Sequence, residues 1–302
     1  MNNSFTFLFP GQGSQFKGMS KNLLNSYKVS KDYYLEAQKI LGYDILEIST
    51  EDPLGNLNQT EFTQPAIFIN SIIKNKILQN KNYIPIAVAG HSLGEYSALV
   101  SCNVLSFKDA LRIIKIRASE MQKSGEKNPG GMLAVLGATK EQIDHLCSNA
   151  EMLVPANYNS DQQIVLSGSK ESIENAIKES KEIGLRKVIP LKTSGAFHSP
   201  LMKSSRNSLS KVIKSIEFKN AKMPIYQNTH PYPEKSGKII KKNLLNQLEN
   251  PVYWNDTMKN MEKNNLNNFL EVGPGNVLSK LAKKINPKSE TITFNTLGLS
   301  HD

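Results

Sequence analysis

The sequence predicts an α/β fold in which a parallel sheet carries a smaller inserted unit. Apolar stretches of strand length alternate with amphipathic stretches of helical periodicity, a pattern typical of parallel sheets. A polar break rich in Gly and Lys, at Lys123–Gly131, interrupts this alternation, and the elements that follow it are spaced differently. The chain of 302 residues is long enough for one large domain with an insertion.

The residues before the break alternate between strands and helices. The first strand, FTFLF, leads directly into PGQGSQ, and the second, IPIAVAG, leads into GHSLG, so each strand ends at a glycine-rich turn. The predicted strands are Phe5–Phe9 and Ile84–Gly90, and the predicted helices are 30–42, 63–78, a helix from about Glu95, and Phe107–Gln122.

The residues after the break predict a small unit with the order βαββαβ, which is the ferredoxin-like pattern. We therefore expect an inserted domain at 126–195 and a large domain formed by 1–125 and 196–302. Helical segments return in the large domain, whose last strand, turn and helix fall at 267–284. Within the insertion, the predicted strands are 132–137, 152–157, 162–168 and 186–191, and the predicted helices start at Lys140 and cover 169–184.

Composition argues against several classes of function. The net charge is +10, but the lysines are scattered and do not form basic runs with interleaved aromatic residues, so we expect no nucleic-acid binding. No apolar run approaches the ~20 residues that span a bilayer, so we expect a cytoplasmic protein with no membrane partner. Cys102, Cys147 and the histidines show no metal-ligand spacing, so we expect no metal site. A lysine-rich surface favours encounter with an acidic partner.

The motif Gly90-His91-Ser92-Leu93-Gly94 places a serine on a sharp turn between a strand and a helix. Such a turn presents the hydroxyl at the carboxyl edge of the sheet, and the Leu93 amide at the start of the helix can face a developing oxyanion. The pattern predicts that Ser92 is a nucleophile. A small polar residue in a glycine-rich turn is the alternative.

A serine nucleophile needs a general base, and the chain offers five histidines. His198 lies in SGAFHSPLM, where the inserted domain returns to the large one, and clefts between domains are common substrate sites. We therefore predict His198 as the base, with a helix-capping role as the alternative. We expect the others not to serve: His91 adjoins the serine but projects differently, His145 is on a helix of the insertion, His230 is in a loop, and His301 is at the C-terminus.

The Gly-Gln-Gly turn after the first strand is predicted to present Gln12 and backbone amides toward Ser92. It is not a dinucleotide loop, because Phe16 occupies the position of the third glycine of that motif. A plain β-turn is the alternative use.

Arg117 falls on the apolar face of its predicted helix, and a buried guanidinium needs a partner. That partner is either an internal carboxylate, such as Glu95 or Glu271, or a carboxylate supplied by the substrate. Asp256 and Glu271 are acidic candidates for a triad, and Gln247 with nearby backbone carbonyls is a candidate to orient the histidine. The apolar face consists of Ala110, Ile113, Ile114, Ala118 and Met121.

Seven motifs occur in the order of a known family. They are FPGQGSQ, GHSLGEYSALV, a helix carrying RASEMQ, NYNS, GAFHSPLM, QLENPVYW and EVGPGNVL. Together they closely resemble malonyl-CoA:acyl carrier protein transacylases, the discrete acyltransferases of fatty-acid synthesis. The resemblance spans Phe5 to about Lys284 and implies an α/β hydrolase-like domain with a ferredoxin-like insertion.

The resemblance also implies a role for each candidate residue. It makes Ser92 the acyl-accepting nucleophile, His198 its general base and Arg117 the binding group for the malonyl carboxylate. The phenylalanine before His198 resembles the malonyl-preferring form of this motif, whereas NTH at 228–230 departs from the family's usual pattern. The remaining implied roles are the oxyanion hole (Gln12 and the Leu93 amide), the orienter of His198 (the backbone carbonyl of Gln247) and the substrate cleft (His91 and Asn157).

The implied function is transfer of a malonyl group from malonyl-CoA to the phosphopantetheine thiol of acyl carrier protein through a malonyl-serine intermediate. The reaction needs no cofactor besides its two substrates. The expected partners are an acidic acyl carrier protein, bound transiently, and a coenzyme A thioester, and we expect a monomer. The alternatives are a discrete acyltransferase of polyketide assembly, a serine esterase or thioesterase, and a catalytically silent scaffold that binds carrier proteins.

Overall fold

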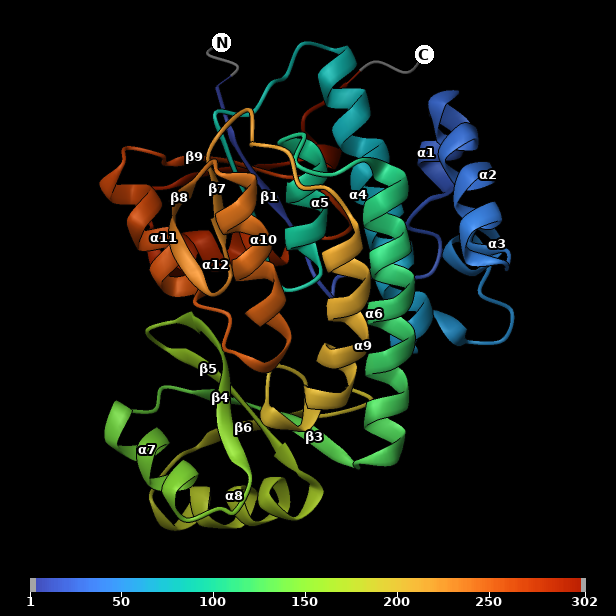
Figure 1. The fold of residues 1–302 in the computed structure, drawn as a ribbon. Coiled ribbons are helices and arrows are strands. Elements are labelled where there is room, and N and C mark those ends of the chain that lie inside the picture. Colours follow the sequence, from blue (N-terminus) through green and yellow to red (C-terminus); the bar gives the residue numbers. More distant parts are fainter. Residues whose placement is uncertain (1–3, 300–302) are drawn as a thin grey trace.

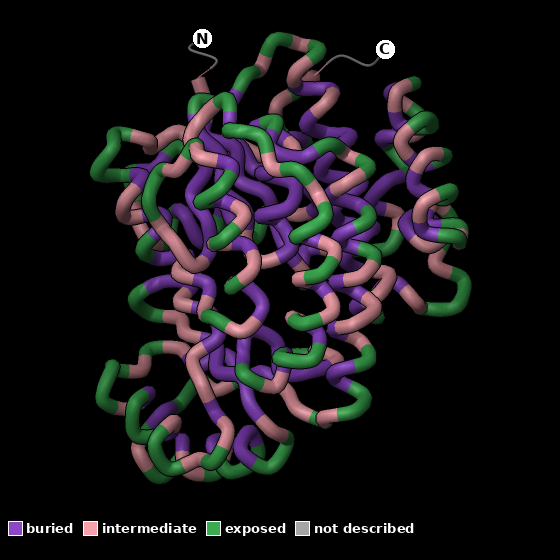
Figure 2. The backbone as a smooth tube through the Cα atoms, viewed as in Figure 1, coloured by how far each residue is buried: buried purple, intermediate pink, exposed green. Residues whose placement is uncertain are grey.

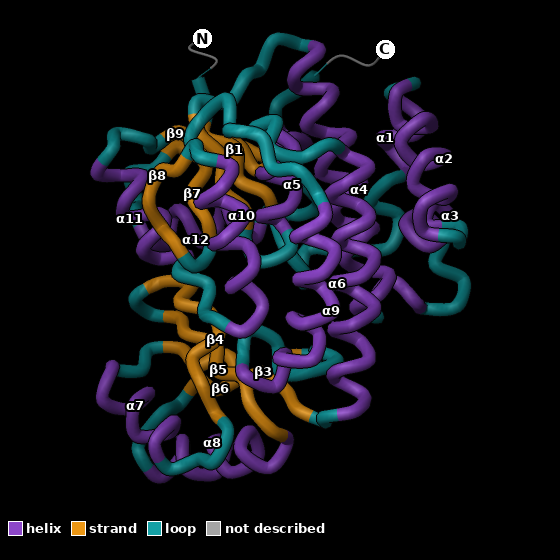
Figure 3. The backbone as a smooth tube through the Cα atoms, in the orientation of Figure 1, coloured by secondary structure: helices purple, strands orange, loops and turns teal. Residues whose placement is uncertain are grey.

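The computed structural model describes residues 4–299, which form a six-stranded sheet and a separate four-stranded sheet (Figure 1). Both sheets are flanked by helices, and the smaller sheet lies at one end of the molecule (Figure 3). The protein is therefore a mixed α/β structure with two layered units. None of the helices in this part of the chain is long and apolar enough to cross a lipid bilayer.

The larger sheet has the strand order β10-β9-β1-β2-β7-β8. Its first five strands pair in parallel, which confirms a largely parallel sheet, and β8 pairs antiparallel with β7 at one edge. The predicted loop around His230 is wrong, because His230 pairs with Gln227 and starts β8. The strands are β1 (Thr6–Phe9), β2 (Ala87–Gly90), β7 (Ile225–Gln227), β8 (His230–Glu234), β9 (Asn268–Glu271) and β10 (Glu290–Thr293).

Side chains alternate across this sheet and fill two cores. Phe7 and Phe9 of β1 point into a core shared with α4, α5 and α6, whereas Leu8 points into a core shared with α11 and α12. Both faces of β1 are therefore buried, as the purple segments through the centre of Figure 2 show. The helices are α4 (Thr60–Asn80), α5 (Gly94–Ser101), α6 (Phe107–Lys127), α11 (Trp254–Lys263) and α12 (Val277–Ile285).

The smaller sheet is antiparallel with the order β4-β5-β3-β6. Helices α7 and α8 cover one face, where Leu133 and Leu166 lie in a core of their own. Met132 and Val165 lie on the opposite face and join the core of the larger unit. The elements are β3 (Gly130–Leu136), α7 (Lys140–Ser148), β4 (Leu153–Ser160), β5 (Gln163–Ser169), α8 (Lys170–Glu182) and β6 (Lys187–Leu191).

Backbone hydrogen bonds join the two units. The Val252 amide donates to the Ala156 carbonyl at 2.8 Å, and the Tyr158 amide donates to the Val252 carbonyl at 2.9 Å. A side-chain ion pair adds to this connection, since Lys259 Nζ lies 2.7 Å from Asp161 Oδ1. Strand β4 is thereby tied directly to the segment that precedes α11.

The predicted break at Lys123–Gly131 is shorter than expected, because α6 continues to Lys127 and β3 starts at Gly130. Gly125 lies inside this longer helix, where a Cβ would lie 1.8 Å from the Ser194 carbonyl oxygen, so the glycine allows the helix and the Ser194 backbone to approach closely. The remaining helices are α1 (Lys21–Ser26), α2 (Val29–Leu41), α3 (Ile45–Thr50), α9 (Lys203–Ser215) and α10 (Gly237–Asn246).

Candidate active site

The turn between β2 and α5 holds Ser92 in a strained conformation. Its φ is 50°, in the left-handed region that non-glycine residues seldom adopt. The flanking glycines are required by close packing: a Cβ on Gly90 would lie 2.0 Å from the Gly94 carbonyl carbon, and one on Gly94 would lie 1.9 Å from the Phe9 carbonyl oxygen. The chain therefore forms the sharp turn that the glycine spacing predicts.

Asn228, which directly follows β7, clamps this turn. Its Oδ1 accepts the Ser92 amide at 2.7 Å, and its Nδ2 donates to the Gly90 carbonyl at 2.6 Å. The backbone amide of Asn228 donates to Glu95 Oε2 at 2.8 Å, so the Glu95 carboxylate holds Asn228 in place. Sequence reasoning singled out NTH only as a departure from a pattern and missed this contact.

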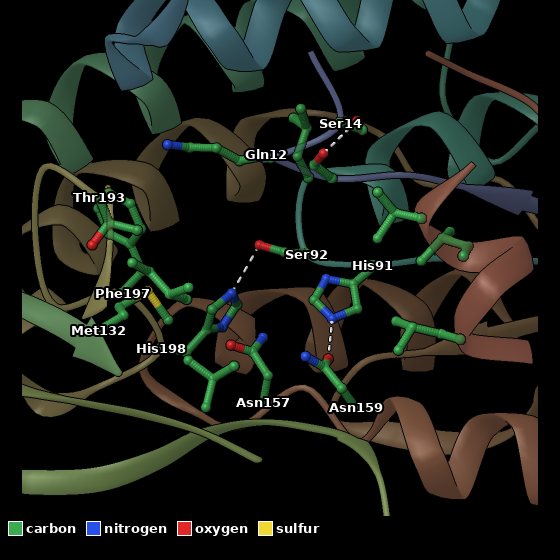
Figure 4. Close-up of a pocket in the computed structure, with 18 of the residues that line it drawn as sticks. Gln12, Ser14, His91, Ser92, Met132, Asn157, Asn159, Thr193, Phe197 and His198 are labelled. Atoms are coloured by element: carbon green, nitrogen blue, oxygen red, sulfur yellow. Dashed lines mark hydrogen bonds between the residues drawn. The ribbon is translucent and has the colours of Figure 1, made fainter. Parts of the chain in front are cut away.

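The hydroxyl of Ser92 and the imidazole of His198 meet in the cavity (Figure 4). Ser92 Oγ lies 2.8 Å from His198 Nε2. His198 Nδ1 lies 3.0 Å from the Gln247 carbonyl oxygen and 3.1 Å from that of Asn250. Because carbonyls only accept hydrogen bonds, Nδ1 carries the proton and Nε2 is left as an acceptor for the serine hydroxyl.

His198 is held as a neutral imidazole. It is 3% exposed, and burial together with the neighbouring Arg117 guanidinium lowers its pKa to about 3. Its φ of 58° is a second strained backbone conformation at the same place. A capping role belongs to the next residue, since Ser199 Oγ accepts the amide of Leu201.

Arg117 lies beside Ser92 and is 1% exposed. Its Nη2 donates to Ser92 Oγ at 3.0 Å and to Gln247 Oε1 at 3.2 Å, and its Nη1 donates to Gln64 Oε1 at 2.6 Å. Within residues 4–299, no carboxylate oxygen lies within 4.0 Å of the guanidinium. Glu271 bonds elsewhere, to the amides of Leu278 and Ser279.

The turn that carries Gln12 packs directly on the Ser92 turn. A Cβ on Gly11 would lie 2.4 Å from the His91 carbonyl oxygen, so glycine is needed for this approach. The Gln12 side chain points away from Ser92 and donates to Thr60 Oγ1 at 3.2 Å (Figure 4). The backbone amides of Gln12 and Leu93 donate to no protein acceptor in the described chain, and both residues line the cavity.

The four-stranded sheet supplies the opposite wall of a cavity of about 430 Å³. Asn159, which sequence reasoning missed, fixes the His91 ring by a contact of 2.9 Å between Oδ1 and Nε2. Asn157 also lines the cavity, and its role in a substrate cleft stays a prediction. Residues from β3, β5 and the 191–198 segment complete this wall: Met132, Gln163, Val165, Leu191, Thr193, Phe197 and His198.

The other titratable candidates lie outside this cavity. His145 pairs with Glu179 on the surface of the smaller unit, His230 is on β8, and His301 is outside the described residues. Asp256 does not line the cavity. Within residues 4–299, no group of three or more histidine, cysteine, aspartate or glutamate residues is arranged to hold a metal ion.

Residues 6–298 match the family of acyl transferase domains. This chain belongs to the acyl transferase family. Among its relatives, this acyltransferase is 39% identical over 294 residues to a malonyl CoA-acyl carrier protein transacylase of Staphylococcus aureus, covering 96% of this chain and 95% of the relative.

Two solved structures show the same fold. One is a malonyl CoA-acyl carrier protein transacylase of Coxiella burnetii, with a TM-score of 0.93 and 33% identity, covering 97% of this chain and 94% of that chain. The other is a malonyl-transacylase in complex with its type II PKS acyl-carrier protein, with a TM-score of 0.92 and 36% identity, covering 96% and 95%. The acyltransferase described here thus shares its whole architecture with these enzymes.

Proposed function

We propose that this acyltransferase moves a malonyl group from malonyl-CoA to the phosphopantetheine thiol of an acyl carrier protein and so supplies the extender unit of fatty-acid synthesis. One observation carries the proposal: Arg117 places a buried cation 3.0 Å from Ser92 Oγ, and no carboxylate of residues 4–299 lies within 4.0 Å of it. A substrate whose acyl group ends in a carboxylate would supply the missing anion. The names of the relatives support the same substrate.

In the first half-reaction, His198 Nε2 accepts the Ser92 hydroxyl proton while Oγ forms a bond to the thioester carbonyl carbon. The negative charge that develops on the carbonyl oxygen is met by the free amides of Gln12 and Leu93. Collapse of this tetrahedral species breaks the carbon–sulfur bond, and the imidazolium returns its proton to the departing thiolate of coenzyme A.

In the second half-reaction, the same groups act in the reverse order. His198 takes the proton of the phosphopantetheine thiol as the sulfur attacks the malonyl-serine ester. The tetrahedral species collapses with release of Ser92 Oγ, which regains its proton from His198. Because coenzyme A leaves before the carrier thiol attacks the malonyl-serine ester, the kinetics should be ping-pong.

Arg117 binds the malonyl carboxylate in this proposal. A bidentate contact requires two guanidinium nitrogens, and Nη2 now contacts Ser92 Oγ and Gln247 Oε1. The incoming carboxylate would replace these neutral acceptors with charged ones, which form stronger hydrogen bonds. An acetyl group would offer no such acceptor, so the guanidinium would keep only its neutral protein acceptors and the more distant charge of Glu95.

The two units correspond in this proposal to an α/β hydrolase-like domain at 1–125 and 196–302 and a ferredoxin-like domain at 126–195. The βαββαβ order and the strand order β4-β5-β3-β6 support the second assignment. The reaction uses no cofactor besides its substrates. The carrier protein is proposed to be acidic and transiently bound, because the chain carries a net charge of +10, and the enzyme is proposed to act as a monomer.

The experiment that tests the function combines intact-mass spectrometry with a transfer assay. After incubation with malonyl-CoA, we expect a malonyl adduct that maps to Ser92, is discharged by a phosphopantetheinylated carrier protein, and is absent in Ser92→Ala. Ser148→Ala, which removes an exposed hydroxyl of the smaller unit, is the control and should behave as wild type. Release of free malonate without transfer would show a thioesterase, and no adduct at all would show a scaffold.

A further inference from the structure

Lys74 is a buried lysine that the proposed mechanism does not use. It lies on α4, is 2% exposed, and its Nζ donates to the Gly273 carbonyl oxygen at 2.6 Å. The same Nζ lies 5.4 Å from the centre of the Phe294 ring. Lysine ammonium groups are rarely buried, because removing the charge from water is costly. A buried lysine that bonds to a loop carbonyl therefore calls for a reason other than stability.

The loop that Lys74 holds supports the turn carrying Gln12. A Cβ on Gly273 would lie 2.4 Å from Pro10 Cγ, and one on Gly275 would lie 3.4 Å from the Ser14 carbonyl oxygen. The two residues that flank the Gly-Gln-Gly turn, Pro10 and Ser14, thus face two glycines of one loop. The Val272 amide also donates to the Leu8 carbonyl at 2.8 Å, which fixes the start of that loop to β1.

Glu271 supplies the countercharge and belongs to the same assembly. It is completely buried at the end of β9 and accepts the amides of Leu278 at 3.0 Å and Ser279 at 2.8 Å, at the start of α12. Burial raises the pKa of Glu271, and burial lowers the pKa of Lys74 to about 7, against the opposing effect of Glu271. Both shifts show that burial disfavours the charged form of each group, so keeping Lys74 and Glu271 buried costs folding free energy.

We propose that Lys74 is a positioning residue for the oxyanion-binding turn: by fixing the Gly273 carbonyl it holds the loop against which Pro10 and Ser14 rest, and so sets the place of the Gln12 amide. This inference rests on the proposed function, in which that amide meets the oxyanion. Displacing a catalytic group by about 1 Å can cost up to about 100-fold in rate. A residue that fixes the position of such a group from a distance can therefore affect the rate.

The test compares Lys74→Met with Lys76→Met. Methionine keeps an unbranched chain but has neither the charge nor the donor, and Lys76 is a partly exposed lysine on the same helix. We expect Lys74→Met to lower kcat about tenfold with KM for malonyl-CoA little changed, since the oxyanion forms only after binding. Its thermal unfolding midpoint should fall, because Glu271 and the Gly273 carbonyl oxygen lose a buried partner, so kcat is measured well below that midpoint. Lys76→Met should match wild type in both measurements.

The two half-reactions make the test specific. The same amides serve both steps, so the coenzyme A burst and the discharge onto a carrier thiol should slow by the same factor in Lys74→Met. A defect confined to discharge, an unchanged kcat, or a loss of kcat/KM that comes from KM alone would each overturn the inference. Wild-type protein is assayed alongside: its failure to transfer malonyl would refute the proposed function itself, whereas wild-type rates in Lys74→Met refute only the role of Lys74.

Discussion

His198 Nδ1 and the Gln247 carbonyl oxygen lie 3.0 Å apart, so a neutral peptide group orients the imidazole. A carbonyl fixes the tautomer as well as a carboxylate does, but it supplies no negative charge to stabilise the imidazolium. Burial lowers the pKa of His198 most, and the positive charge of the Arg117 guanidinium lowers it further. The arrangement therefore keeps Nε2 of His198 unprotonated and ready to accept the Ser92 proton.

The pH dependence of the first half-reaction should reflect this low pKa. A base with a pKa of about 3 is neutral throughout pH 5–8, so the coenzyme A burst should not fall around the usual histidine pKa of about 6.5. Stopped-flow bursts measured from pH 8 to pH 5 check this without interference from the acceptor thiol. A rate that halves between pH 6 and pH 7 would show that His198 titrates normally.

The same shift should affect stability. Because the folded-state pKa of His198 lies below its unfolded value, the unfolded chain binds the extra proton between about pH 6.5 and pH 3. This group therefore contributes stability above about pH 6.5 that is lost as the pH falls toward 3. The thermal midpoint of wild type should decline over that window more steeply than that of His198→Asn, and parallel curves would contradict the assignment.

Replacing Arg117 should lower malonyl transfer far more than acetyl transfer. Arg117→Gln keeps a polar side chain at this position but removes the cation that contacts Gln64 and Gln247, so malonyl transfer should fall by at least about 100-fold while acetyl transfer changes far less. Competing malonyl-CoA and acetyl-CoA in one assay gives the ratio directly. Equal losses for both acyl groups would make Arg117 a structural residue.

Gly94 should tolerate no side chain. A Cβ there would lie 1.9 Å from the Phe9 carbonyl oxygen, so Gly94→Ala should lower the free energy of unfolding by more than about 3 kcal/mol or prevent folding. Gly131→Ala is the control, because its nearest neighbour would be 3.8 Å away. Denaturant titrations of the two variants should differ accordingly, and equal stabilities would mean that the Ser92 turn can open without cost.

Asn228 should act on the rate through the Ser92 turn. Asn228→Asp has the same shape, but its second carboxylate oxygen would face the Gly90 carbonyl oxygen, and both atoms are acceptors. Its negative charge would also lie near the Glu95 carboxylate, and the two would repel. We expect kcat to fall at least about tenfold with the protein still folded. Exposed Asn207→Asp should have wild-type kcat, and a wild-type rate in Asn228→Asp would remove Asn228 from the support of the nucleophile.

Residue type and local spacing were enough to predict part of this site. The glycines around Ser92 predict a sharp turn because their spacing is a local backbone property, and Arg117 stands out because a charge on an apolar helix face is unusual. Asn159, Asn228 and Gln64 could not be found in this way. Amide side chains have no periodic signature, and their contacts depend on segments that lie more than 50 positions away.

In the fold, too, local sequence patterns predict some elements, whereas others depend on tertiary contacts. The alternation of strands and helices predicts a parallel α/β sheet, and β1 and β2 lie where the apolar runs place them. Strand β8 was missed because its HPYPE segment has two prolines and little apolar character, and its pairing depends on β7 beside it. The end of α6 was set five residues too early, because Gly125 was taken as a breaker although tertiary packing requires it there.

The reacting groups of the cavity belong to the larger unit, and part of its lining comes from the four-stranded sheet. Ser92 and Arg117 lie on the larger unit, whereas Met132 and Val165 lie on the insertion and line the same cavity. A substitution at Met132 or Val165 can therefore change the shape of the cavity without replacing Ser92, His198 or Arg117.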